Sequence, residues 1–322
     1  MKKHLFFAIG LCIAFCACKK EVTPANQNHV DATTDKSSAL YDVGFNLTGF
    51  TTETKGISSS KLQTNSVLGN SIKYLSYYVY NGSLDSLKLV KKIDQKYTDS
   101  NFGSIKDSLR AGHYVIIFVG SKSGNYQLTT AFDLFALGTY VPALQYKNDN
   151  KFGDTFSARI DIDVKTSVKQ NIVLKRIVSM VTFKLHDQLP ADVYKIVVGL
   201  DNAVPKYDIL YDRAAYDGTH GLDFNPRYEE FILTDSQKGK TDLEFSTYVW
   251  PFSNYLTPSI KAYSKTGVLL AQKIINDPNP NFILSVEANT QYILAGYLFG
   301  VPLSKFTISV DGKWDPPQNS TF

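Results

Sequence analysis

The sequence predicts an all-β protein built from two β-sandwich domains. Short stretches in which apolar and polar residues alternate with a period of two recur along the chain, separated by Gly, Pro, Asn and Asp. No convincing amphipathic helix of ten or more residues lies between them, which argues against a fold of alternating strands and helices. The 20 Tyr and 20 Phe suit half-buried strand surfaces. With 322 residues, of which 43% are hydrophobic, the chain can form two cores.

The first residues are typical of an export signal. Lys2 and Lys3 precede an apolar run from Leu5 to Ala17, which at about thirteen residues is too short to span a bilayer as a helix. Ala17 followed by Cys18 resembles the lipobox of bacterial lipoproteins. That resemblance implies that residues 1–17 are a signal peptide, cut between Ala17 and Cys18, and that Cys18 is fatty-acylated. An ordinary cleaved signal with an unmodified Cys18 is the alternative. Both interpretations place the mature chain outside the cytoplasm.

Residues 18–40 are predicted to be a flexible tether. They are polar and contain few large apolar side chains, so they cannot bury enough surface to fold alone. The first strand follows, because Val43, Phe45 and Leu47 alternate with smaller or polar residues.

The N-terminal sandwich is predicted over residues 41–174. His113 to Val119 is an uninterrupted run of mostly β-branched and aromatic residues, which is typical of a strand buried on both faces. Asp133 to Leu137 is expected to form a helical turn. The further strands are expected at 71–80, 87–93, 104–109, 126–130, 158–164 and 172–174.

The C-terminal sandwich is predicted over residues 175–322, ending in a short polar tail. No Pro/Gly-rich linker precedes it, so the two domains are expected to abut near Leu174 to Arg176. In the last strand, Phe306, Ile308 and Val310 lie on one face. The other strands are expected at 176–185, 193–200, 208–211, 231–234, 243–250, 259–263, 268–275, 282–287 and 292–299.

Composition excludes several classes of function. All three cysteines, Cys12, Cys16 and Cys18, lie in or at the end of the signal, which removes disulfides, cysteine-ligated zinc and cysteine nucleophiles. The net charge is +4, and Lys2 and Lys3 of the signal carry two of these charges. The nearly neutral mature chain has no cluster of basic residues, so nucleic-acid binding is not expected.

No set of residues indicates catalysis, a cofactor or a metal. The adjacent pair His186 and Asp187 is interpreted as a surface turn, because a catalytic His also needs a nucleophile nearby. Asp161 and Asp163 share one strand face beside Arg159, which is interpreted as a solvated face. A cluster of tyrosines is interpreted as core packing, with sugar stacking as the alternative; its members are Tyr74, Tyr77, Tyr78 and Tyr80.

The chain as a whole resembles the fimbrillin-like superfamily of Bacteroidetes, which comprises pilus subunits and fimbrial anchor or accessory lipoproteins. The resemblance spans roughly residues 41–310. It rests on the lipoprotein signal and tether together with four segments: 43–50, the Tyr-rich 75–80, 109–120 and the junction 174–187. Its patterns are those of strands and turns.

The resemblance implies two tandem transthyretin-like, Greek-key β-sandwich domains that assemble by strand addition, in which one subunit's strand completes a sheet in its neighbour. It makes Val43, Phe45, Leu47, Phe306, Ile308 and Val310 the candidate strand-exchange residues. In stalk subunits of this family, a protease that cuts after Arg removes the first strand. This chain departs from that pattern, since residues 19–109 contain no arginine and the first is Arg110. We therefore expect the first strand to be retained.

The sequence thus predicts a non-enzymatic fimbrial anchor or accessory subunit. It is expected to be attached to the outer membrane by its N-terminal lipid and displayed on the cell surface or in the fimbrium. Its expected partners are other fimbrial subunits and, in addition, a host or environmental surface ligand. A lipoprotein that binds glycans at the cell surface is the alternative.

Overall fold

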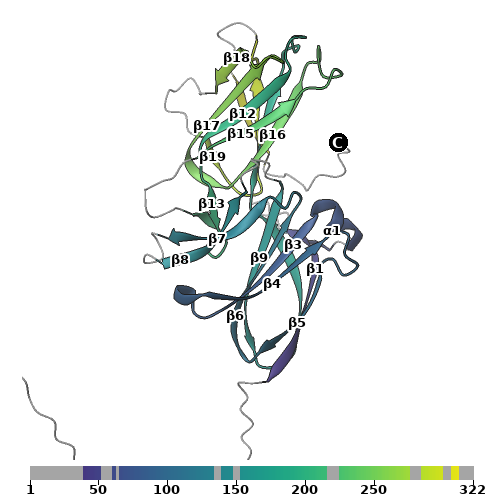
Figure 1. The fold of residues 1–322 in the computed structure, drawn as a ribbon, viewed down its shortest axis with the longest axis vertical. Coiled ribbons are helices and arrows are strands. Elements are labelled where there is room, and N and C mark those ends of the chain that lie inside the picture. Colours follow the sequence, from purple (N-terminus) through teal and green to yellow (C-terminus); the bar gives the residue numbers. More distant parts are fainter. Residues whose placement is uncertain are drawn as a thin grey trace, which may run out of the picture. The chain divides into compact units, whose positions relative to one another are not determined.

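The protein is all-β, as the sequence predicts (Figure 1). The computed structural model describes residues 39–51, 60–62, 65–133, 139–147, 153–215, 225–275, 284–299 and 306–311. The chain from Ser37 to Phe322 forms one compact unit. The predicted signal peptide, almost all of the tether and the tail lie outside the described residues. So do residues 134–137 of the expected helical turn, whose first residue, Asp133, belongs to a strand.

The first half of the chain is dominated by one eight-stranded sheet of order β2-β1-β10-β9-β6-β3-β4, in which β5 also pairs with β1. The helix α1 (Asn65–Ser71) lies beside β1, and a short 3₁₀ helix (Leu84–Ser86) precedes β4. The strands are β1 (Leu40–Thr51), β2 (Ser60–Leu62), β3 (Tyr74–Asn81), β4 (Lys88–Lys96), β5 (Ser104–Arg110), β6 (Gly112–Ser121), β9 (Thr155–Val164) and β10 (Val168–Arg176).

This sheet curls over on itself at β9 and β10. These strands pair only where Lys175 lies opposite Ser157 and Arg176 opposite Phe156, so the part that contains β1 can fold back over the part that contains β6. The Phe45 ring of β1 accordingly packs edge-on against the Phe118 ring of β6, with 5.4 Å between the ring centroids. The apolar faces of the two parts thus enclose the first core.

The central strand β6 is buried on both faces. From Tyr114 to Ser121 every residue is buried, which confirms the prediction from its uninterrupted apolar run. One face meets the first core, and the other is covered by a small sheet of order β14-β13-β8-β7. That sheet is formed by β7 (Tyr126–Asp133), β8 (Thr139–Tyr146), β13 (Lys206–Asp208) and β14 (Arg213–Ala215).

The second half forms two further four-stranded paths that enclose another core. One has the order β16-β11-β20-β21, with strands β11 (Ser179–Leu185), β16 (Leu243–Val249), β20 (Gln291–Gly296) and β21 (Thr307–Asp311). The other has the order β15-β12-β17-β18, with strands β12 (Lys195–Ala203), β15 (Asn225–Ile232), β17 (Phe252–Tyr263) and β18 (Leu269–Ile274). The short β19 (Leu284–Val286) also pairs with β17.

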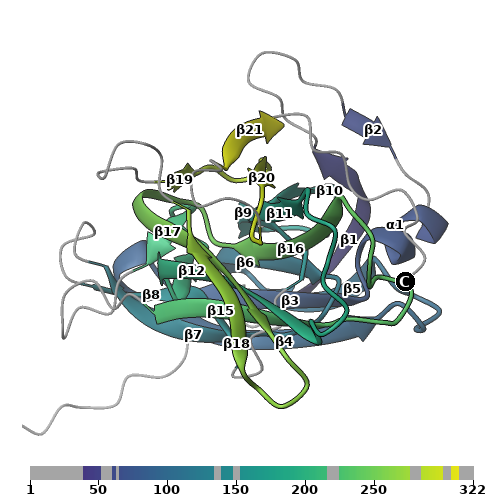
Figure 2. The same ribbon diagram turned by 90° about the horizontal axis from the view of Figure 1, so that it is seen from above.

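The two halves repeat the same set of strand pairings in the same chain order. In the first half, β1 is parallel to β10 and antiparallel to β5, while β3 lies between β4 and β6, and β6 pairs with β9. In the second half, β11 is parallel to β20 and antiparallel to β16, while β12 lies between β15 and β17, and β17 pairs with β18. The strand β21 beside β20 has no counterpart in this pattern (Figure 2).

A buried ion pair fastens the segment where the halves meet. The Arg176 guanidinium donates to both carboxylate oxygens of Asp154 at 2.7 and 2.9 Å, and both side chains are 1% exposed. The same guanidinium donates to Asn289 at 2.8 Å, so it joins the end of β10 to the turn before β20. It also lies over the Phe156 ring, 5.0 Å from its centroid.

An aromatic stack reinforces the same region. The fully buried Trp250 ring is stacked between Tyr146 and Tyr207, with centroid distances of 5.0 and 5.1 Å. The guanidinium of Arg227 covers the Tyr146 ring at 4.5 Å. Residues from both halves therefore share one core here, which is consistent with the absence of a Pro/Gly-rich flexible linker between the halves.

The structure corrects several strand predictions. The segment 176–185 is divided, because β10 ends at Arg176 and β11 begins at Ser179. The expected strand at 208–211 is a turn after β13, where the Asp208 carboxylate accepts hydrogen bonds from the backbone N–H groups of Leu210 and Tyr211. The strand β8 and the helix α1 were not predicted.

Candidate functional site

The first strand-exchange candidates lie in an interior strand. β1 is parallel to β10 on one side and antiparallel to β5 and β2 on the other, so it has hydrogen-bonding neighbours along both edges. Val43, Phe45 and Leu47 are buried in the first core, as their alternation predicts. A bulge at Thr48 shifts the register against β10 between Leu47 and Gly49. Removing this strand would leave a long apolar groove with unpaired backbone groups.

The second set of candidates lies in a much less enclosed strand. Within the described residues β21 pairs with β20 alone, and Val310 is 60% exposed. Phe306 and Ile308 are partly buried and pack against the second core. The Phe306 ring occupies space that opens because Gly296 has no side chain, since a Cβ there would lie 2.7 Å from the ring. Phe306 and Ile308 therefore contact the core, whereas Val310 faces solvent.

The two sets of candidates belong to different sheets and do not form a single site. They differ in how each strand is held, since β1 is paired on both edges and β21 on one. The predicted lipidation and cleavage residues, Cys18 and Ala17, lie outside the described residues.

A groove lies on the uncovered part of the first sheet. The small sheet covers β3 and β6 but leaves the adjoining face of β4 open to solvent. The β3–β4 register pairs Tyr74 with Lys96 and Ser76 with Asp94, and it also pairs Tyr78 with Lys92. Because paired residues point to the same face, the side chains from β4 line the open floor and those from β3 line its inner edge.

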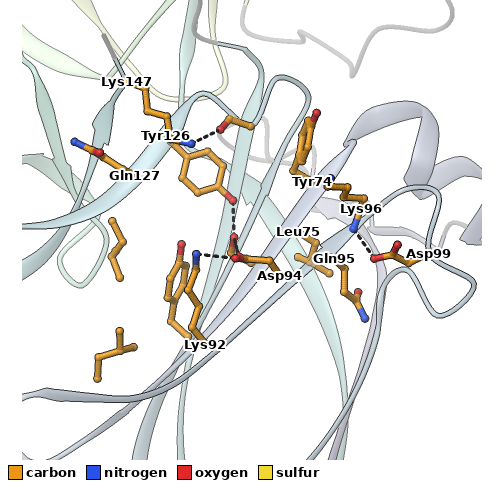
Figure 3. Close-up of a pocket in the computed structure, with 15 residues that line it drawn as sticks. Tyr74, Leu75, Lys92, Asp94, Gln95, Lys96, Asp99, Tyr126, Gln127 and Lys147 are labelled. Atoms are coloured by element: carbon orange, nitrogen blue, oxygen red, sulfur yellow. Dashed lines mark hydrogen bonds and ion pairs between the residues drawn. The ribbon is translucent and has the colours of Figure 1, made fainter. Parts of the chain in front are cut away.

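The groove has a volume of about 700 Å³, within the range of ligand sites, and a fixed polar floor (Figure 3). The Ser76 hydroxyl donates to Asp94 at 2.6 Å and lies 3.0 Å from the Tyr126 hydroxyl. Lys92 is 2.7 Å from the other oxygen of Asp94, and that hydrogen bond raises the pKa of Lys92. Burial raises the pKa of Tyr126, which therefore keeps its proton at neutral pH.

An exposed aromatic ring stands at one end of this groove. Tyr74 is 39% exposed, and its ring rests against Gly124, where a Cβ would lie 2.9 Å from the ring. A smaller hollow of about 380 Å³ shares Asp99 with the groove and contains Tyr97, which is 53% exposed. The ammonium group of Lys73 lies 4.0 Å from the centroid of the Tyr97 ring. Side chains alternate along β3 and β4, so Lys73 and Tyr97 lie on the opposite face of the sheet from Tyr74 and Lys96, and the smaller hollow is a separate feature beside α1. We call the groove that contains Tyr74 the tyrosine trough.

The tyrosine cluster combines two roles. Tyr77, Tyr78 and Tyr80 are buried, which confirms the interpretation as core packing, whereas Tyr74 is exposed in the groove. The sequence could not separate Tyr74 from its neighbours, because its exposure depends on where the small sheet ends. Tyr97 carried no signal in the sequence.

The acidic and histidine candidates lie in ordinary ion pairs. His186 pairs with Asp242 at 2.6 Å, while the neighbouring Asp187 accepts a hydrogen bond from the backbone of Leu298. Hydrogen bonding to His186 lowers the pKa of Asp242. On β9, Asp161 pairs with Arg159 at 3.0 Å, and the exposed carboxylate of Asp163 pairs with His113 at 2.9 Å.

Two features are absent from the described residues. No group of three or more His, Cys, Asp or Glu side chains is arranged to hold a metal ion in the ranges that the structure covers. Among the same residues, no helix has the length and apolar character needed to cross a membrane.

Comparison with solved structures identifies the fold. A candidate polysaccharide-binding protein (DUF1812) from Bacteroides thetaiotaomicron matches 86% of this chain and 98% of its own, with a TM-score of 0.50 and 12% identity. The chain shares the fold of this candidate polysaccharide-binding protein. The fimbrial anchor protein Mfa2 from Porphyromonas gingivalis matches 85% of this chain and 98% of its own, with a TM-score of 0.46 and 14% identity. The tip fimbrial protein Mfa3 from the same organism, in a C-terminally truncated form, matches 84% of this chain and 99% of its own. Its TM-score is 0.40 and its identity is 10%.

The resemblance expected from the sequence is thus confirmed as a likeness of fold. No family profile and no curated protein matches the sequence. At 12% identity the first likeness speaks for the fold alone.

Proposed function

We propose that this protein is a non-enzymatic, lipid-anchored fimbrial subunit of the anchor or accessory type, which joins other fimbrial subunits by β-strand addition. The observation that carries the proposal is the repeated pairing pattern with an added strand, β21, at the edge of β20. Because β21 stands outside the pattern, exchanging it for a partner's strand would leave both copies of the pattern intact. The edge of β20 and the space above Gly296 would then accept a partner's strand and its apolar side chains.

The repeated pattern also supports two tandem Greek-key β-sandwiches of the transthyretin-like kind, divided between residues 41–174 and 175–322. Each copy begins with a strand, β1 or β11, that lies parallel to a late strand of the same half. Parallel neighbours cannot be joined by a hairpin, so such a pair marks a chain that crosses from one sheet of a sandwich to the other.

We infer further that β1 is retained in the mature protein. Its interior position means that removal would leave the edges of β5 and β10 unpaired and would expose the core residues that Phe45 contacts, Tyr77 and Phe118. A chain that keeps β1 needs no partner's strand to complete its first sandwich, which suits a subunit at an end of a filament. The predicted lipid on Cys18 would hold such a subunit at the outer membrane, at the cell surface or within the fimbrium.

The mature N-terminus tests this proposal directly. We expect intact-mass analysis of the protein from its native membrane to show a chain that begins at Cys18 and carries fatty acids. It should cofractionate with filaments of high mass, because strand addition makes it part of them. A Cys18→Ala variant is the matched control and should lose the lipid without losing the fold. A mature chain that begins between residues 50 and 70 would contradict the retention of β1.

A second function, glycan binding at the cell surface, is favoured by the tyrosine trough. An exposed Tyr ring beside fixed polar groups is the surface that sugars need, since sugar rings have apolar faces edged by hydroxyl groups. Retention on polysaccharide affinity gels without cofractionation with filaments would favour this function over the first.

A further inference from the structure

We propose that the tyrosine trough binds an extended acidic oligosaccharide, such as a chain of uronic acids. This inference rests on the second function above and names its site and ligand class. Tyr74 would serve as the platform for one sugar unit, and the lysines of the trough would bind the acid groups.

The shape of the trough favours an extended chain. Its lining runs along β4 from Leu89 to Lys96, so a ligand that rests on Tyr74 can continue along that strand. Tyr74 lies beside Lys96, its partner on β4, and its ring remains exposed although it rests against Gly124.

The charges favour an acidic ligand. The trough contains three lysines and two aspartates; these are Lys92, Lys96, Lys147, Asp94 and Asp99. Lys92 and Asp94 form an ion pair at 2.7 Å, and Asp99 accepts a hydrogen bond from the backbone N–H of Lys96 at 2.8 Å. The ammonium group of Lys147 donates to the backbone carbonyl of Gly124 at 3.5 Å. Positive charge therefore exceeds negative charge along the trough, which attracts anionic ligands.

The floor is preorganised for hydrogen bonding. Ser76, Asp94 and Tyr126 hold one another in place, and the Tyr126 hydroxyl donates to the backbone carbonyl of Val119 at 3.3 Å. Side chains that are already fixed lose little conformational freedom when a ligand binds. The flexible parts of the site are the lysine side chains, which can adjust to the positions of the acid groups.

The test uses tetragalacturonate and its neutral methyl ester as probes, with binding to the full mature chain measured by calorimetry at two salt concentrations. We expect tetragalacturonate to bind and its affinity to fall with added salt. Tyr74→Ala should weaken binding about fivefold to tenfold, which is the effect of losing one stacking contact. Lys96→Gln should weaken binding and reduce its salt dependence. The matched controls Tyr140→Ala and Lys265→Gln, both exposed outside the trough, should leave binding unchanged.

The outcomes separate the parts of the proposal. If the methyl ester binds as tightly as the acid and Tyr74→Ala weakens both, the trough binds glycans but the acidic class is wrong. If tetragalacturonate binds equally to the Tyr74→Ala variant and to the unchanged protein, the site is wrong. If the chain is retained on other polysaccharides but binds neither probe, the ligand class is wrong although glycan binding stands. If no polysaccharide retains it, the second function fails with the inference.

Discussion

The Arg176→Met variant is expected to lose about 3–5 kcal/mol of unfolding free energy, because the change leaves the buried carboxylate of Asp154 without its partner. The pair is 1% exposed on both sides and has bidentate geometry, so no water can replace the guanidinium without opening the core. The variant also loses the hydrogen bond to Asn289 that ties β10 to the turn before β20. Urea unfolding at neutral pH, followed by circular dichroism, measures the loss.

The matched control replaces the whole pair. The double variant Arg176→Met with Asp154→Leu removes both charges and should recover much of the lost stability, because an apolar pair of similar volume has no desolvation cost. If the double variant were as unstable as the single one, the loss of unfolding free energy would come from altered packing and not from the unpaired charge of Asp154.

The same single variant has a predictable response to pH. Burial raises the pKa of Asp154, and the guanidinium of Arg176 opposes that rise. Without Arg176 the folded-state pKa of Asp154 rises further above its unfolded value, so folding takes up a proton. The stability that this proton supplies is present at low pH and is lost as pH rises through the folded pKa. The deficit of Arg176→Met relative to the unchanged protein should therefore shrink as the pH is lowered.

Phe45→Ala is expected to be the most damaging single change in β1, at about 3–5 kcal/mol. The side chain is fully buried, and its ring contacts those of Phe118 and Tyr77 at centroid distances of 5.4 and 5.8 Å. Its removal leaves a cavity between the two parts of the curled sheet that the surrounding strands cannot easily close. The midpoint of urea unfolding measures the effect.

Val310→Ala in β21 is the matched control for that change. Its side chain is 60% exposed, so we expect a change of no more than about 0.5 kcal/mol. Equal costs for Phe45→Ala and Val310→Ala would mean that both strands are held to the same degree. That result would remove the distinction between a retained β1 and an exchangeable β21.

Much of the fold could be predicted from local patterns, because strand periodicity records burial on one face or both. The alternation of Val43, Phe45 and Leu47 predicted β1, and the apolar run of β6 predicted burial on both faces. The break between β10 and β11 at 177–178 was missed, because Ile177 and Val178 are as apolar as the strands on either side. Local pattern could not reveal it, since those residues pack in the core that both halves share.

Predicting the candidate sites required knowledge of which strands, far apart in the sequence, lie side by side. Sequence alone suggested Phe306, Ile308 and Val310, but the weaker hold on β21 follows from its single neighbour, β20, which only the pairing reveals. The tyrosine trough exists because the small sheet stops short of β4, and β8 of that sheet was not predicted. Tyr74 and the lysines of β4 become one surface only after the strands are assembled.

Native-state hydrogen exchange, resolved by peptide mass spectrometry, tests most directly whether β1 is permanent and β21 exchangeable. We expect the amides of β1 between Val43 and Leu47 to exchange only through global unfolding, because both edges of that strand are paired. The amides of β21 from Thr307 to Asp311 should exchange through local opening, orders of magnitude faster. Protection of β21 equal to that of β1, or early loss of protection in β1, would contradict assembly through an exchangeable last strand.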